Sequence, residues 1–208
     1  GGIGCGKSAA SQLFSELGID VIDTDVISQR LTQPTGLAIP LIQKEFGKDF
    51  ITADNALDRS KMRQLVFSNE DARLRLENIL HPLILQETLL HIEHSHSSYI
   101  ILVVPLLLEN DEYRTLVQRI LVIDCDEEQQ LRRTMSRSQL SEQQVRSIMA
   151  AQVSRQFRLQ NADDVIVNNQ DLAHLRTQAL QLHRIYLSLS QDFASSNPCI
   201  LLRIQCLT

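Results

Sequence analysis

Three observations predict an α/β protein built on a parallel β-sheet. Residues 1–8 read GGIGCGKS, which fits the pattern G-x-x-x-x-G-K-[ST]. Short apolar runs alternate with segments of helical periodicity, as in parallel sheets joined by crossover helices. The span between the first two runs is too long for one crossover, so it must hold additional helices. Together these features predict a single domain with a helical insertion.

The opening octapeptide predicts a loop that binds phosphate groups. Glycines allow the backbone conformations that turn consecutive N–H groups toward an anion. In this pattern Lys7 reaches the β- and γ-phosphates, Ser8 ligates Mg²⁺, and the following helix adds the positive end of its dipole. The residues predicted to bind the nucleotide are Gly2, Gly4, Cys5, Gly6, Lys7, Ser8 and Ala9.

A helix is predicted directly after the loop, over residues 9–17, and Gly18 stands at the C′ position that often takes a left-handed conformation. Such a loop normally follows a buried strand, and the sequence starts at Gly1. We therefore expect the active protein to carry roughly 6–10 further residues upstream, ending in an apolar strand. The alternative is that the apolar tail, residues 200–204, takes the place of that strand.

Four short apolar runs are predicted as strands: residues 19–22, 99–104, 120–123 and 165–167. Ligands of parallel sheets bind beyond the carboxyl ends of the strands. The polar or special residues at these ends are the ones to consider for a site, and they are Asp23, Asp25, Pro105, Glu109, Asp124 and Asn168.

The remaining pattern divides the chain into a core, an insertion and a lid. The core comprises about residues 1–27, 99–125 and 161–190, the last part with one amphipathic helix to about Leu189. The insertion, about 28–98, has helical periodicity at 37–46, 61–67 and 71–92. Residues 126–160 are rich in Arg and Gln and are predicted as two exposed helices of a lid, with a capping box at Ser141. Residues 191–208 stay unassigned.

Composition excludes several classes of protein. The 208-residue chain is 43% hydrophobic and has a net charge of −5, so it offers no basic surface typical of nucleic-acid binding. It has neither an apolar run of about 18 residues nor a signal peptide, so we expect a cytoplasmic protein without a membrane span. The four cysteines form no C-x-x-C pair, which argues against a zinc site. His91, His94 and His96 are expected to be solvated imidazoles near a helix end.

A set of short motifs in a fixed order is the most specific signal in the sequence. The motifs are GGIGCGKS at 1–8, VIDTD at 21–25, LDR at 57–59 with VF at 66–67, LHP at 80–82, VVPLLLE at 103–109, Gln130 with Arg133 and Arg137, AAQ at 150–152 with Arg155, and ADDVI at 162–166 with Asn168 and Asn169. Through these stretches, from residue 1 to about 190, the chain resembles the dephospho-CoA kinases, which are P-loop kinases of the nucleoside-monophosphate-kinase-like group. It departs from that pattern in the absent first strand, in Cys5, which often is Ser, and in Leu108, which often is Phe.

The resemblance implies a three-layer P-loop NTPase fold and ATP-dependent phosphorylation of the ribose 3′-hydroxyl of dephospho-CoA, the last step of coenzyme A biosynthesis. It implies ATP and Mg²⁺ as cofactors, dephospho-CoA as the acceptor, no nucleic-acid or membrane partner, and a monomer. The alternatives are another small-molecule or nucleotide P-loop kinase, or a non-catalytic nucleotide-binding module. A GTPase is unsupported because residues 168–171, NNQD, lack the lysine of N-K-x-D.

Phosphoryl transfer to a hydroxyl needs a base for the hydroxyl proton and cations for the charge on the phosphoryl group. A carboxylate near the acceptor hydroxyl takes its proton as the bond to phosphorus forms, and we assign this role to Asp25. In an extended segment Asp23 projects to the same side and would assist through Mg²⁺ or by orientation; the alternative makes Asp25 the N-cap of the next helix. Arg133 and Arg137 lie four residues apart on one helix face, so they can clamp the transferring phosphoryl group together with Lys7. Their alternative is a solvated face paired with Glu127 or Glu128.

Other candidates stay open between two roles. Asp58 and Arg59 either orient the substrate or pair within the insertion, and His81 either contacts substrate or holds a helix boundary or kink at Pro82. Glu109 either contacts substrate or anchors the insertion. Arg155 is a further candidate for a lid cation, and Asp124 is a candidate for a Walker-B carboxylate. Cys5, beside Lys7, is either a reactive thiol of lowered pKa or an inert residue.

Overall fold

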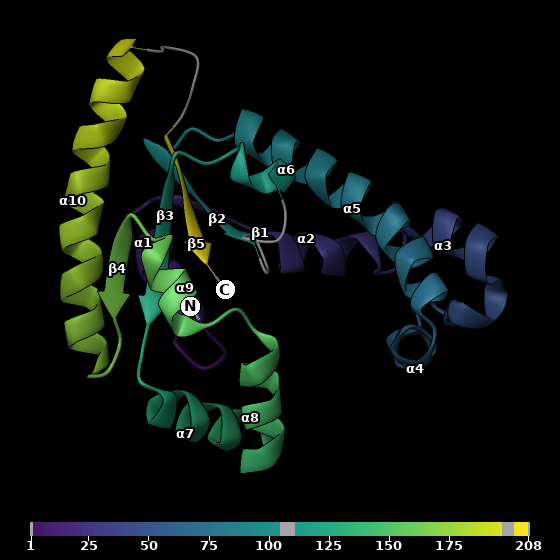
Figure 1. Ribbon diagram of the computed structural model, residues 1–208. Coiled ribbons are helices and arrows are strands. Elements are labelled where there is room, and N and C mark those ends of the chain that lie inside the picture. The colour runs from purple at the N-terminus through teal and green to yellow at the C-terminus, as the bar shows by residue number, and fades with distance from the viewer. Residues whose placement is uncertain (1, 105–110, 197–201, 208) are drawn as a thin grey trace. The chain divides into compact units, whose positions relative to one another are not determined.

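The computed structural model describes residues 2–104, 111–196 and 202–207 (Figure 1). The chain divides into two compact units. One comprises Gly1–Ile22 with Ser95–Thr208, and the other comprises Asp23–His94.

The first unit is built on a five-stranded sheet with the order β1-β2-β5-β3-β4. The strands are β1 (Asp20–Asp23), β2 (Tyr99–Val104), β3 (Arg119–Asp124), β4 (Asp164–Val167) and β5 (Leu202–Leu207). Parallel pairing joins β2 to β5, β5 to β3, and β3 to β4. All six residues of β2 are buried, as expected for a continuous apolar run in a sheet covered on both faces. The four predicted strands, β1 to β4, are confirmed.

One face of the sheet is covered by α1 (Lys7–Glu16) and α10 (Leu172–Ser196), which contact each other. Alternate residues of β2 and β3 point to this face because side chains alternate along a strand. The resulting core contains Leu13 and Phe14 of α1, Leu175 and Tyr186 of α10, and residues from the strands between them. The helix predicted after the loop is confirmed, and Gly18 has the expected positive φ, 81°. The last helix runs to Ser196, past the predicted end at Leu189.

The central position of the sheet is filled from the C-terminal tail. β5 lies between β2 and β3, with Leu207 level with Val104 on one side and Val122 on the other. Ile204 is fully buried in the core. Residues 202–207, part of the segment left unassigned by sequence, therefore form the inner strand, and the alternative considered for residues 200–204 is met in its described part, 202–204.

Three helices, not the predicted two, follow β3: α7 (Glu127–Ser138), α8 (Glu142–Ala151) and α9 (Arg155–Gln160). The third is separate because Ser154 caps a new helix by accepting the N–H of Phe157. The capping box at Ser141 is confirmed, with Gln144 as its partner. A short helix, α6 (Asp111–Arg114), precedes β3.

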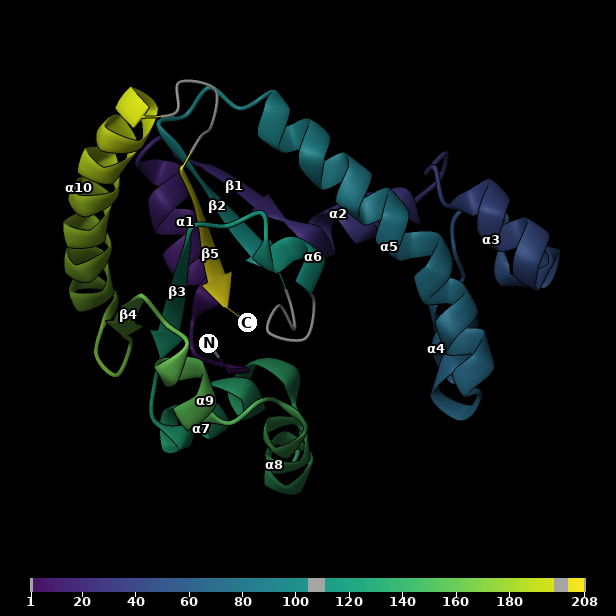
Figure 2. The ribbon, with the colours of Figure 1, turned by 45° about the horizontal axis from the view of Figure 1, so that its top comes forward.

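The second unit is helical, with α2 (Thr24–Leu31), α3 (Ile39–Phe46), the 3₁₀ turn η1 (Lys48–Phe50), α4 (Arg59–Ser68) and α5 (Glu70–Glu93). The long α5 contacts α2, α3 and α4 (Figure 2). Pro82 lies inside α5 without ending it, so the helix boundary considered there is wrong. None of the helices in the described part of the chain is both long and apolar enough to span a membrane.

Candidate phosphate-binding site

The loop before α1 has the backbone conformation that its glycines predict. Gly4 and Gly6 have φ of 75° and 91°, in the left-handed region that favours glycine. A Cβ on Gly6 would lie 2.3 Å from the amide nitrogen of Asn168, and one on Gly4 would lie 2.6 Å from Oγ1 of Thr134. Glycine is therefore required at both positions by conformation and by space.

Side chains from three other segments hold the loop in place. Asn168, after β4, donates from Nδ2 to the carbonyl of Cys5 at 2.8 Å. Gln152, after α8, accepts the N–H of Ile3 at 3.1 Å. The sulfur of Cys125, directly after β3, lies 4.0 Å from the carbonyl oxygen of Gly4. The loop thus lies at the carboxyl edge of β3 and β4, where a parallel sheet places its ligands.

The first turn of α1 is left without a side-chain cap. Gly6 is the N-cap residue and supplies no side-chain acceptor, so the first N–H groups of the helix are not satisfied by a capping side chain. Ser8 is exposed, and Lys7 and Ala9 are partly buried. This arrangement suits an anion, because the helix N-terminus offers both donors and the positive end of the dipole.

Two buried thiols meet under the loop. Cys125 donates to the sulfur of Cys5 at 3.3 Å, and Gln130 donates from Nε2 at 2.8 Å. The bond from Cys125 lowers the pKa of Cys5 to about 6, against burial, which raises it. The same bond and burial raise the pKa of Cys125. The lowered pKa expected for Cys5 is found, but its largest cause is the second thiol, and the Cys5 side chain is only 1% exposed.

Asp124, at the end of β3, is paired with Arg155 at the start of α9. Arg155 donates from Nε and Nη2 to the two carboxylate oxygens at 2.8 and 2.6 Å, and Asp124 is buried. Bidentate pairs of this kind combine charge with fixed geometry. Both carboxylate oxygens of Asp124 are thus in contact with Arg155, which supports a structural role over that of a Walker-B ligand.

The two arginines predicted as a phosphoryl clamp lie on α7. Arg133 donates from Nη1 to the carbonyl of Asn168 at 2.9 Å, so it ties α7 to the segment that also holds the loop. Arg137 lies in the last turn of α7 and is exposed. Neither shows an ion pair with Glu127 or Glu128 among the interactions of the described residues.

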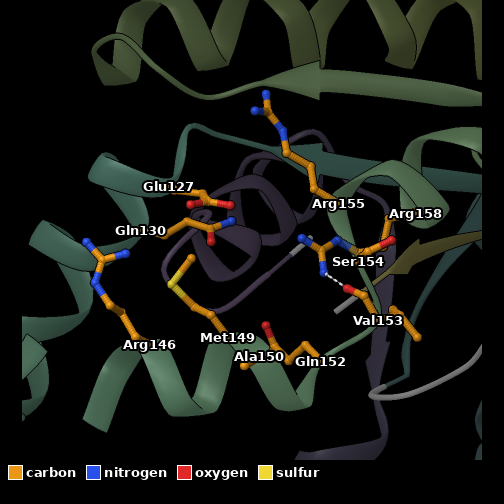
Figure 3. A pocket seen from close by; sticks show the side chains of 10 residues that line it. All are labelled: Glu127, Gln130, Arg146, Met149, Ala150, Gln152, Val153, Ser154, Arg155 and Arg158. Atoms are coloured by element: carbon orange, nitrogen blue, oxygen red, sulfur yellow. Dashed lines mark hydrogen bonds between the residues drawn. The ribbon is translucent and has the colours of Figure 1, made fainter. Parts of the chain in front are cut away.

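A pocket of about 360 Å³ opens between α7, α8 and α9 (Figure 3). Its lining consists of Glu127, Gln130, Arg146, Met149, Ala150, Gln152, Val153, Ser154, Arg155 and Arg158. Three of these residues are arginines and one is acidic, which favours an anionic ligand. A Cβ on Gly2 would meet Nε2 of Gln130 at 2.8 Å and Nη2 of Arg158 at 3.0 Å, so the pocket adjoins the start of the phosphate loop.

The predicted acidic pair lies in the second unit and differs from the extended arrangement expected. Asp23 ends β1 and is the N-cap of α2, accepting the N–H of Asp25 on its Oδ1 at 2.8 Å. Asp25 is an exposed residue in the first turn of α2. The expectations of an extended Asp23–Asp25 segment and of Asp25 as the N-cap are therefore both wrong, because a helix begins at Thr24.

The other candidates of this unit are engaged locally. Asp58 is the N-cap of α4 and accepts the N–H of Lys61 at 3.0 Å, while Arg59 donates to Oγ1 of Thr32 at 2.8 Å. These bonds support pairing within the insertion. His81 is exposed on α5. Glu109 and Pro105 lie outside the described residues.

Several residues that support the loop were not predicted as site residues: Gln130, Thr134, Cys125, Gln152 and Arg158. Gln130 and Thr134 are buried polar residues four apart on α7, so they share the face turned to the loop. For Gln130 the sequence also held a signal, since it stands among the motifs of the family resemblance. The described residues contain no cluster of three His, Cys, Asp or Glu suited to a metal ion, and His91, His94 and His96 are exposed as expected.

Comparisons with known proteins agree with this architecture. A sequence model of the dephospho-CoA kinase family matches residues 1–174. Curated proteins named dephospho-CoA kinase from Nitrosomonas europaea and Nitrosospira multiformis are 58% and 52% identical over 191 residues, which cover 92% of this chain and 94% and 96% of theirs.

Solved structures show the same fold. TT1252 from Thermus thermophilus aligns with a TM-score of 0.73 at 25% identity, covering 89% of this chain and 93% of that one. The dephospho-CoA kinase from Campylobacter jejuni aligns with a TM-score of 0.59 at 24% identity, covering 87% and 91%. The chain belongs to the dephospho-CoA kinase family.

Proposed function

We propose that this chain transfers the γ-phosphoryl group of ATP to the ribose 3′-hydroxyl of dephospho-CoA, giving coenzyme A and ADP. The observation that carries the proposal is the phosphate loop, with left-handed Gly4 and Gly6 and no side-chain cap on α1. The loop supports the phosphate donor, and membership of the family supports the acceptor.

The β- and γ-phosphates would bind the N–H groups of the loop and of the first turn of α1, with the ammonium group of Lys7 at the γ-phosphate. Mg²⁺, when bound with ATP, neutralises charge on the phosphates. The exposed hydroxyl of Ser8, in the first turn of α1, fits this ion, because Mg²⁺ takes oxygen ligands and keeps most of its sites for water and phosphate. The Asp23 carboxylate is a further oxygen donor that we propose for the metal or for orientation.

We assign the general base to Asp25. It would accept the proton of the 3′-hydroxyl as the new O–P bond forms and the bond to the leaving ADP breaks. The hydrogen bond between Asp23 and the N–H of Asp25 fixes the start of α2, so Asp23 also positions the base.

We assign the stabilisation of the transferring group to Arg133 and Arg137. Charge develops on the phosphoryl oxygens in the transition state, and guanidinium groups offer planar, bidentate donors to such oxygens. Arg133 is already anchored through Asn168, beside the loop, and Arg137 lies one turn further along the same face.

A coupled assay of ADP release tests the function, with dephospho-CoA, AMP, shikimate or no acceptor added to MgATP. We expect release above the background with dephospho-CoA only. Release with AMP or shikimate at an equal rate would support another small-molecule kinase. If the chain binds ADP but forms no ADP from ATP with any of the acceptors, the result would support a non-catalytic nucleotide-binding module.

A further inference from the structure

Two thiols lie against each other at the phosphate loop. Cys5 belongs to the loop, and Cys125 follows β3, 120 residues further along the sequence. Their sulfur atoms are 3.3 Å apart, and both side chains are buried and reduced. An S–S bond is about 2.05 Å long, so the two sulfurs need to approach by only about 1.3 Å to be joined. The fold therefore holds a pair of cysteines close to the geometry of a disulfide.

The two thiols differ in chemical character. The hydrogen bond from Cys125 lowers the pKa of Cys5, and Gln130 gives the Cys5 sulfur a second donor at 2.8 Å. The same bond, together with burial, raises the pKa of Cys125. Cys5 is thus favoured as the thiolate, which is the form that attacks an oxidant, while Cys125 keeps its proton.

A pocket adjoins this pair of thiols. Gln130, which donates to the Cys5 sulfur, also lines the pocket of about 360 Å³ between α7, α8 and α9 (Figure 3). The Cys5 side chain is only 1% exposed, so an oxidant reaches the sulfur when Gln130 or the loop moves aside. Small local openings of this kind admit a small molecule more readily than a bulky one. We therefore expect hydrogen peroxide to reach the pair from this pocket.

Cys125 lies between two anchored neighbours. Asp124, the last residue of β3, is in register with Val167 of β4. On the other side, the N–H of Asp126 donates to Oδ1 of Asn169 at 2.8 Å. When the two sulfurs approach each other, most of the movement must therefore come from the loop.

The loop cannot move in this way and keep its own contacts. Cys5 lies between Gly4 and Gly6, both in left-handed conformations, and its carbonyl accepts a hydrogen bond from Asn168 at 2.8 Å. A hydrogen bond from N–H to oxygen holds over only about 2.7–3.2 Å. A displacement of about 1.3 Å at Cys5 therefore disturbs the N–H groups that are proposed to bind phosphate.

We propose that Cys5 and Cys125 form a modification site, in which a hydroperoxide joins them in a disulfide that weakens nucleotide binding by the phosphate loop. A low-molecular-weight thiol reverses the modification by thiol–disulfide exchange. This inference goes beyond the proposed function and takes from it only that a nucleotide is the ligand of the loop.

The oxidation takes place in two steps. The Cys5 thiolate attacks one oxygen of hydrogen peroxide, the O–O bond breaks, and a sulfenic acid and hydroxide are formed. The Cys125 sulfur then attacks the Cys5 sulfur, so that the S–S bond forms and the S–O bond breaks. The leaving hydroxyl group takes the proton of Cys125 and departs as water, and the hydroxide of the first step takes up the proton that Cys5 had released. Two thiols and one peroxide thus give one disulfide and two molecules of water.

The first test treats the unaltered chain with hydrogen peroxide. After the remaining thiols are alkylated and the chain is cut with trypsin, mass spectrometry should find the peptide that ends at Lys7 joined to residues 120–132. ADP affinity, measured by calorimetry, should fall at least about tenfold and recover with dithiothreitol. Absence of this cross-link would overturn the proposal, and so would an ADP affinity within about twofold of the reduced chain once the cross-link is complete.

Cys125→Ser is the matched variant, because serine keeps an O–H group that can donate to the Cys5 sulfur and removes the second sulfur. Peroxide should then leave Cys5 as a sulfenic acid that dimedone traps, and on longer treatment as a sulfinic acid that dithiothreitol does not reduce. ADP affinity lost in this way should not recover. Full recovery with dithiothreitol after the longer treatment would refute the role of Cys125.

A second variant leaves only the proposed pair. Replacing both Cys199 and Cys206 with serine keeps Cys5 and Cys125 out of the four cysteines of the sequence. The cross-link should form in this variant at a rate within about twofold of the parent. Loss of the cross-link would show that another cysteine takes part and would overturn the assignment.

The last measurement uses the unaltered chain in buffers of oxidised and reduced dithiothreitol, with and without saturating ADP. A ligand that binds the reduced form tenfold more tightly raises the midpoint potential of the pair by about 30 mV. We expect a rise of at least this size, and an unchanged potential would refute the coupling between the disulfide and the loop. The readouts are the cross-link, ADP affinity and the potential, so absence of transfer to dephospho-CoA would contradict the proposed function and leave this inference standing.

Discussion

Replacing Gly6 with alanine tests how closely the phosphate loop is fitted to the sheet edge. With φ at 91°, an alanine here costs about 1–2 kcal/mol in the left-handed conformation. Its Cβ would also lie 2.3 Å from Nδ2 of Asn168, which must move and break its hydrogen bond to the Cys5 carbonyl. Leaving these buried groups unpaired costs about 1–3 kcal/mol.

The two costs together amount to about 2–5 kcal/mol, and a tenfold change in affinity corresponds to about 1.4 kcal/mol. If the loop avoids this cost by taking another conformation, the fraction of molecules whose loop can bind ADP falls by the corresponding factor, and so does the apparent affinity. ADP affinity, measured by calorimetry, is therefore expected to fall at least roughly 30-fold in Gly6→Ala.

Gly18→Ala is the matched control. Gly18 also has a positive φ, 81°, but a Cβ there would meet no heavy atom within 4 Å. It should lose about 1–2 kcal/mol of stability and keep its ADP affinity. A double-mutant cycle that combines Gly6→Ala with Asn168→Ala isolates the clash. The loss of ADP-binding free energy in the double variant should be smaller than the sum of the two single losses, by about 0.5–3 kcal/mol. Unchanged ADP affinity in Gly6→Ala, or strict additivity in the cycle, would refute the steric reasoning.

Four further predictions concern chemistry and pH. Asp25→Asn should abolish phosphoryl transfer and retain ATP binding, and turnover within about threefold of the parent would contradict the general-base role. Arg137→Ala should lower kcat by roughly 10² with little change in the acceptor KM, whereas a raised KM at constant kcat would show uniform binding instead. Cys5, whose pKa is lowered by the hydrogen bond from Cys125 but which is only 1% exposed, should be alkylated slowly, and more slowly with MgADP; mass spectrometry showing equal rates with and without MgADP would favour an inert loop residue. Burial lowers the pKa of His183 from its ordinary value of 6.5, so the unfolded chain binds more protons, and the melting temperature should fall as pH is lowered through 6.5; His183→Gln should reduce this slope, and an unchanged slope in that variant would contradict the assignment.

The parts of the fold that were predictable from sequence have local causes. The apolar run at 99–104, stopped by Pro105, predicted a buried strand, and the glycines at 4 and 6 allow the left-handed backbone that the loop requires. The capping box at Ser141 works in the same way, since both of its hydrogen bonds lie within four residues.

The errors arose where local signals are ambiguous. In Asp23-Thr24-Asp25 either aspartate can cap a helix, and sequence does not say which one ends the strand. The structure has Asp23 in that role, which places Asp25 in the first turn of α2 rather than in an extended segment with Asp23. Residues 126–160 were predicted as two helices and form three, because Ser154 looks like any polar helix residue in the sequence, whereas its hydroxyl accepts the N–H of Phe157 and starts a new helix.

The support of the phosphate loop was the least predictable part because it depends on distant pairs. The bonds to Cys5 come from Cys125, Gln130 and Asn168, more than a hundred residues away in sequence. A pattern of eight residues predicts that a loop can bind phosphate, but the energy that keeps it in that conformation is supplied by side chains whose proximity only the folded sheet creates. Substitutions at these supporting positions should therefore weaken nucleotide binding even though the motif itself stays intact, and a search for the motif alone would not detect such a loss.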